Sequence, residues 1–98
     1  MSESTPQESP FGPVDFASYV MSIASSAMVT LGQLPDPATN IITIELDTAR
    51  HLIDVLSMLE EKTKGNLDAT EQKLVTSLLY DLRVGFVEAQ RKHSISKP

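Results

Sequence analysis

The chain has 98 residues, enough for one domain with a modest core. It contains no cysteine, which excludes disulfides, thiolate metal sites and cysteine catalysis. Its net charge of −5 argues against nucleic-acid binding, which needs Lys and Arg to neutralise phosphates. We see no export signal and expect a cytoplasmic protein.

Residues 1–13 hold three prolines among polar residues and have no run of apolar residues, which predicts a disordered tail. The next stretch, Phe16–Pro35, has twenty residues without one charge. Its spacing predicts a helix over Phe16–Leu31, with Asp15 as N-cap and Gly32 just beyond the end. Serines along the opposite face argue against a membrane span and favour a central packing helix. The apolar face carries Phe16, Val20, Ile23, Ala24, Ala27 and Leu31.

Ile41–Leu46 alternates isoleucine with polar residues, which indicates a short β-strand. No other segment has this pattern, so we expect the strand to pair with its own copy in a second subunit. The alternative is an extended linker whose isoleucines pack on the helices.

The second predicted helix runs from Asp47, as N-cap, to Lys64, with Gly65 beyond its end. We expect Arg50 to pair with acidic neighbours such as Asp54. The apolar stripe of this helix consists of Ala49, Leu52, Ile53, Leu56 and Leu59.

The third predicted helix opens at Asp68, which forms a capping box with Glu71, and ends near Gln90. Gly85 lies at the edge of its apolar face and indicates a close contact with another helix. Residues 91–98 are predicted to be a flexible tail. The apolar face consists of Leu74, Val75, Leu78, Leu79, Leu82 and Phe86.

These elements predict an all-α fold, a three-helix, bundle-like subunit with a single domain over residues 14–90. The helices carry more apolar ridges than one such unit can bury, which favours a homodimer. The alternative is that the tails or the strand fold over these ridges. The candidate interface residues are Tyr19, Met28, Val55, Met58, Tyr80, Val84 and Val87.

We find no residue pattern that predicts an enzyme. His51 is expected at the surface or in an interface, and His93 falls in the tail. The Glu-x-x-His pairs typical of metal sites in helical bundles do not occur, so we expect neither a metal nor a cofactor. Asp81 and Arg83 have no opposite charge one helical turn away, so they are candidates for an ion pair across helices or for docking a partner.

Four segments resemble a family of bacterial domains of unknown function, the one numbered eighteen forty-four. They are Phe16–Ala24, Leu31–Pro37, Ile53–Leu67 and Leu79–Arg83, and the block Glu61–Leu67 is the most specific. The resemblance implies a soluble, helical bacterial protein and no particular activity. Its pattern includes polar positions, which favour docking of a partner: Asp54, Lys62, Lys64, Asn66, Asp81 and Arg83.

Our main hypothesis is a non-enzymatic homodimer that works as a protein-interaction or adaptor module with an unidentified protein partner. Its shared surface would combine the first helix with the Tyr80 ridge. The alternative is a small-molecule or anion-binding protein that uses Arg83 with Lys62 or Lys64. A third, weaker hypothesis is nucleic-acid association through Arg91, Lys92 and Lys97. No membrane partner is expected.

Overall fold

The structure is a computed structural model that describes residue 12 and residues 14–96, with side chains as far as residue 93. It consists of three helices, α1 (Phe16–Thr30), α2 (Leu46–Lys62) and α3 (Ala69–Ser96). Within these described residues there is no strand, so the all-α prediction is confirmed. The tail predicted for residues 1–13 lies, apart from Gly12, outside them.

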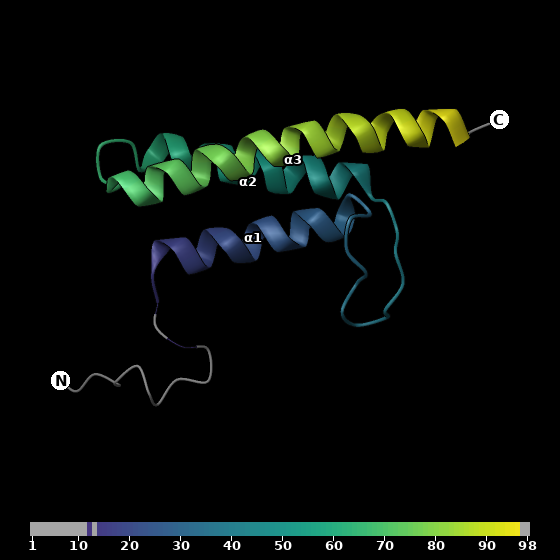
Figure 1. Ribbon diagram of the computed structural model, residues 1–98, viewed down its shortest axis with the longest axis horizontal. Coiled ribbons are helices and arrows are strands. Elements are labelled where there is room, and N and C mark those ends of the chain that lie inside the picture. Colours follow the sequence, from purple (N-terminus) through teal and green to yellow (C-terminus); the bar gives the residue numbers. More distant parts are fainter. Residues whose placement is uncertain (1–11, 13, 97–98) are drawn as a thin grey trace.

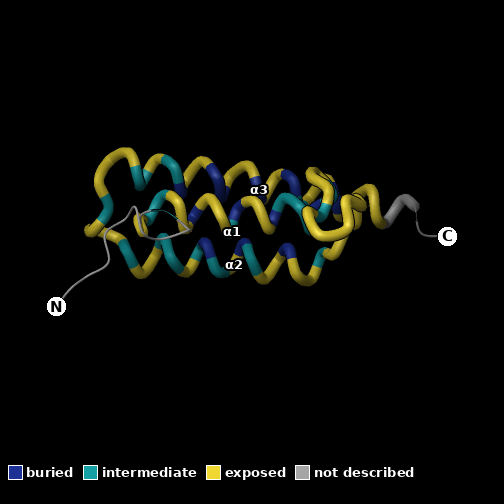
Figure 2. Tube along the Cα trace, turned by 90° about the horizontal axis from the view of Figure 1, so that it is seen from below, coloured by how far each residue is buried: buried dark blue, intermediate teal, exposed yellow. Residues whose placement is uncertain are grey.

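The helices form a bundle in which α1 covers one side of the other two. α2 runs antiparallel to both α1 and α3 (Figure 1). Seen from below, α1 lies over the seam between α2 and α3 (Figure 2). The opposite side of α2 and α3 therefore has no helix on it.

The ends of α1 follow local sequence signals. Asp15 accepts a hydrogen bond from the Ser18 backbone N–H at 2.7 Å, as an N-cap does. At the other end Gly32 has a φ of 80°, and the Gln33 N–H bonds the Met28 carbonyl at 2.9 Å. This is a Schellman-type stop, which glycine permits because it carries no Cβ.

The predicted start of α2 was wrong by two residues. Glu45 is the N-cap and makes no side-chain capping bond, while Asp47 lies in the first turn. Leu46 packs against the core and so draws the helix start towards itself, and the Glu45 N–H bonds the Thr30 carbonyl at 2.8 Å. At the far end α2 stops at Lys62, two residues before the predicted end.

The Ile41–Leu46 segment forms no strand in this chain. Residues 41–45 have no regular secondary structure, and Leu46 already belongs to α2. Ile41 and Ile42 are 58% and 60% exposed, so the isoleucines do not pack fully on the helices either. Ile44 is less exposed, at 37%, and its side chain lies next to Gly32, just after α1. Pairing of this segment with a second copy stays a prediction.

The predicted end of α3 was also wrong. The capping box is confirmed, since the Asp68 N–H bonds Glu71 Oε1 at 3.0 Å and the Glu71 N–H bonds Asp68 Oδ1 at 2.8 Å. The helix then continues to Ser96, six residues past Gln90. The sequence after Gln90 contains no glycine, and its first proline is Pro98, so nothing local ends the helix earlier.

The apolar stripes predicted on the three helices meet in one core. Leu56, Leu79 and Leu82 are its largest fully buried side chains, each of which stabilises the fold by about 1.5–3 kcal/mol. Phe16, Ile23, Leu52, Leu74 and Phe86 pack around it, partly buried. The buried residues are Val20, Ala24, Ala27, Leu31, Ala49, Ile53, Leu56, Val75, Leu78, Leu79, Leu82 and Ala89.

Candidate functional site

Hydrogen bonds hold α2 beside the first turns of α3. Glu60 Oε2 accepts from Gln72 Nε2 at 3.1 Å and from Thr76 Oγ1 at 3.0 Å. One carboxylate of α2 thereby bridges two successive turns of α3. This contact sets the register between the two helices near the loop that joins them.

Two arginines continue the contact between α2 and α3 further along. Arg83 donates from Nη2 to Ser57 Oγ at 3.3 Å. Arg50 lies over Phe86, with its guanidinium carbon 5.4 Å from the ring centroid, within cation–π range. Within the described part of the chain Arg50 makes no ion pair with Asp54, so the pairing predicted along α2 does not form.

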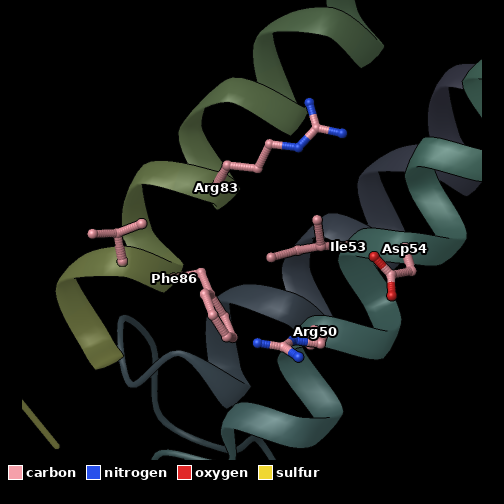
Figure 3. Close-up of a pocket in the computed structure, with 6 residues that line it drawn as sticks. Arg50, Ile53, Asp54, Arg83 and Phe86 are labelled. Atoms are coloured by element: carbon pink, nitrogen blue, oxygen red, sulfur yellow. The ribbon is translucent and has the colours of Figure 1, made fainter. Parts of the chain in front are cut away.

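A pocket of about 260 Å³ lies between these side chains. The guanidinium of Arg50 reaches towards Phe86, while Arg83 extends from α3 and Asp54 lies on α2 (Figure 3). The pocket is lined by Arg50, Ile53, Asp54, Arg83, Phe86 and Val87, all from α2 or α3. It combines apolar walls with charges of both signs, and α1 contributes nothing to it.

An apolar ridge on α3 adjoins this pocket. Tyr80, Val84 and Val87 are 68%, 41% and 51% exposed, and they line a second depression together with Arg83, Glu88 and Arg91. On α2, Met58 is 48% exposed and follows Asp54 by one helical turn. We define the α2–α3 face by the following residues: Arg50, Asp54, Met58, Tyr80, Arg83, Val84 and Val87.

The candidate interface residues do not form one surface. Tyr19 is 59% exposed on α1, whereas Met28 packs against the core and Val55 is half-buried. The first helix and the Tyr80 ridge were predicted to share a surface, but neither depression on the α2–α3 face is lined by an α1 residue. The spacing of apolar residues within α1 and α3 could not show whether the two helices share a surface, because that depends on how the helices pack against each other.

The predicted docking residues separate into two groups. Asp54 and Arg83 line the same pocket. Lys62, Lys64 and Asn66 are exposed at the end of α2 and in the loop after it, and no lysine lines either depression that contains Arg83. These two depressions therefore do not support the predicted cleft of Arg83 with Lys62 or Lys64.

Asp81 is exposed on α3, and its carboxylate makes no hydrogen bond or ion pair with any other residue between 14 and 93. Arg83 uses Ser57 as its partner instead. His51 is exposed on α2, as expected of a surface residue. No group of three or more potential metal-ligating side chains occurs in the described ranges.

The sequence did not single out Arg50 and Phe86 as site residues. Arg50 was explained by an ion pair along its own helix, and Phe86 was explained by its position on the apolar face of the third helix. A second groove, of about 600 Å³, was also not foreseen. It is lined by α1, the 31–45 loop and the start of α2, and its lining includes Ser25, Val29, Leu34, Pro35, Thr48 and Leu52.

The fold and the site define a small three-helix domain with an uncovered, mixed apolar and charged face. Among the described residues, none of the helices combines the length and the apolar composition needed to cross a bilayer. The chain belongs to the family described as domain of unknown function DUF1844, whose model matches residues 13–88. No curated protein and no solved structure matches the chain.

Proposed function

We propose that this protein is a non-enzymatic, homodimeric protein-interaction module. One observation carries the proposal: on the side of α2 and α3 that α1 does not cover, Tyr80, Val84 and Val87 are exposed along one depression of α3, and Met58 of α2 is exposed as well. Apolar patches of this kind usually mark interfaces. Tyr, Met and Arg are the residue types enriched at interface centres.

The groove on the other side of the molecule supports an adaptor role. It lies between α1 and the loop, and its rim includes Leu34, which is 42% exposed. A module with two separate apolar surfaces can bind its own copy with one and a different protein with the other. In the same loop Ile41, Ile42 and Ile44 are exposed, so residues 41–45 are the segment that we propose to pair with a strand of another chain.

The chemistry of the α2–α3 pocket suits docking rather than catalysis. Its ionisable groups are Arg50, Asp54 and Arg83. Arginine stays protonated in proteins and so does not act as a general base. The remaining lining is apolar, which favours a binding surface.

The oligomeric state tests the homodimer directly. Size-exclusion chromatography with light scattering at micromolar concentration should give about twice the chain mass of 10.7 kDa. A clean monomer under these conditions would reject the homodimer. The adaptor part is tested by capture from a bacterial lysate with the wild-type chain and with Ile42→Ser. A protein captured equally well by both does not use the exposed loop.

A second candidate function is anion binding, which one observation favours: two guanidinium groups, of Arg50 and Arg83, line the same pocket. The planar guanidinium group can donate two parallel hydrogen bonds to a carboxylate or a phosphate. Inorganic phosphate and benzoate should then raise the melting temperature of the wild type but not of Arg83→Ala. Equal effects on both proteins would exclude this pocket as the anion site.

A further inference from the structure

α2 carries an acidic stripe along its uncovered side. Asp47, Asp54 and Glu61 are all exposed. They are spaced seven residues apart, and residues at this spacing lie on nearly the same face of a helix because two turns take about seven residues. Asp54 lines the α2–α3 pocket, so the stripe borders the α2–α3 face.

α3 carries the complementary pattern on the same side. Tyr80, Val84 and Arg91 line one depression and follow each other at spacings of four and seven residues. Lys73, seven residues before Tyr80, falls on the same stripe and is exposed. Lys73 therefore lies beyond one end of the apolar ridge, Arg91 lies at the other end together with Glu88, and Arg83 lies beside its centre.

The register of the two helices places the opposite charges at matching heights. Arg50 lies opposite Phe86 and Glu60 opposite Thr76, so each step along α2 corresponds to one step back along α3. Asp54 is then level with Leu82, next to Arg83.

The same relation holds at both ends of the stripe. Asp47 is level with Ala89, two residues from Arg91, and Glu61 is level with Val75, two residues from Lys73. Each of the three acidic residues in the stripe thus lies within two residues of the level of a basic residue of α3.

We propose that two copies pack through their α2–α3 faces about a twofold axis parallel to the helices. This inference rests on the homodimer proposed above and assigns its surface and orientation. The rotation lays α2 of each copy against α3 of the other at the same height. Asp54 then meets Arg83 of the second copy twice, and the Tyr80 ridge packs beside Met58 at the centre.

Charge favours this face and this orientation over the others. The face is balanced, with Asp47, Asp54, Glu61 and Glu88 against Arg50, Lys73, Arg83 and Arg91, whereas the chain as a whole carries −5. Two copies can therefore meet here without net repulsion. A twofold axis perpendicular to the helices would instead lay one acidic stripe against the other, and like charges across an interface are strongly unfavourable.

Charge reversal tests the face and the orientation together. Asp54→Arg alone places two arginine side chains opposite each other, the new one and Arg83 of the other copy. Arg83→Glu alone likewise places a glutamate opposite Asp54. We expect each variant by itself to weaken dimerisation by about tenfold or more. In an equimolar mixture both contacts become attractive again, so native mass spectrometry should show mainly the one-to-one heterodimer.

Matched controls are reversals outside the face, Asp81→Arg on α3 and Lys64→Glu in the loop, which should dimerise like the wild type. Circular dichroism must show that every variant keeps its helix content. If the wild type dimerises and the single reversals do so equally well, the assigned face is wrong while the homodimer stands. If the single reversals weaken the dimer but the mixture does not restore it, the orientation is wrong. A monomeric wild type would overturn both proposals.

Discussion

Gly85 of α3 lies against Leu31 at the end of α1: a Cβ at position 85 would stand 3.3 Å from Leu31 Cδ1 and would overlap with the side-chain nitrogen of Gln33. The contact predicted at this glycine therefore exists, but it involves the residues just after α1 rather than the helix itself. Because Gln33 is exposed, its amide can turn outward into solvent.

We expect Gly85→Ala to raise the free energy of unfolding by up to about 1 kcal/mol, because alanine is the better helix former. Gly85→Leu should lower it by about 1–3 kcal/mol, since no space exists for the larger side chain. Denaturation in urea measures both. A loss of stability in Gly85→Ala would show that Leu31 cannot give way.

Gly32 and Gly65 form a matched pair for a second prediction. Both have positive φ, 80° and 87°, but a Cβ at Gly32 would lie 2.9 Å from Ile44 Cγ1 while one at Gly65 would meet nothing. Gly65→Ala should cost about 1 kcal/mol for its backbone conformation alone. Gly32→Ala should cost more, and the excess should vanish in an Ile44→Ala background. If Gly32→Ala and Gly65→Ala lose the same free energy of unfolding, the contact with Ile44 does not contribute to the cost at position 32.

Ala24 is fully buried at the centre of α1. Ala24→Leu inserts three carbons into the core and should lower the free energy of unfolding by about 1–3 kcal/mol. The matched control is Ser22→Leu, at an exposed position of the same helix, which should change stability little. An unchanged melting temperature in Ala24→Leu would contradict the tight packing of α1 on α2 and α3.

The Asp68–Glu71 capping box supplies a fourth prediction. Asp68→Ala removes the acceptor of the Glu71 N–H and should cost about 1 kcal/mol, whereas Asp68→Asn keeps an acceptor and should cost less. Thr70→Ala, at an exposed position in the first turn of α3, controls for the loss of side-chain atoms. Thermal unfolding monitored by circular dichroism gives the comparison. If Thr70→Ala lowers the stability as much as Asp68→Ala does, the capping box does not have the stabilising role assigned to it.

Local chemistry made much of the fold predictable. Asp15, Gly32 and the Asp68–Glu71 box mark helix ends through hydrogen bonds and backbone conformations that involve only neighbouring residues. The errors arose at helix ends that are set by contacts with distant residues, or where the sequence has no residue that stops a helix. Leu46 joined α2 because it packs on the core, and α3 ran on because no residue stopped it.

The candidate site was predictable only in part. The exposed ridge of Tyr80, Val84 and Val87 followed from helical spacing on one element. Its neighbours did not: Arg50 had acidic residues nearby along its own helix, yet it lies over Phe86 of α3. That choice depends on which residues two helices bring together.

The sequence by itself determined three amphipathic helices, half of their six ends, most residues of their core and the family, because these depend on short-range periodicity, capping and residue identity. Only the tertiary structure decided which side α1 covers. That choice left one face of α2 and α3 uncovered (Figure 2), kept α1 residues such as Tyr19 out of both depressions on that face, and set Asp54 in the same pocket as Arg83. The physical reason is that helix stacking is set by the fit of side chains far apart in the chain, which no local pattern records.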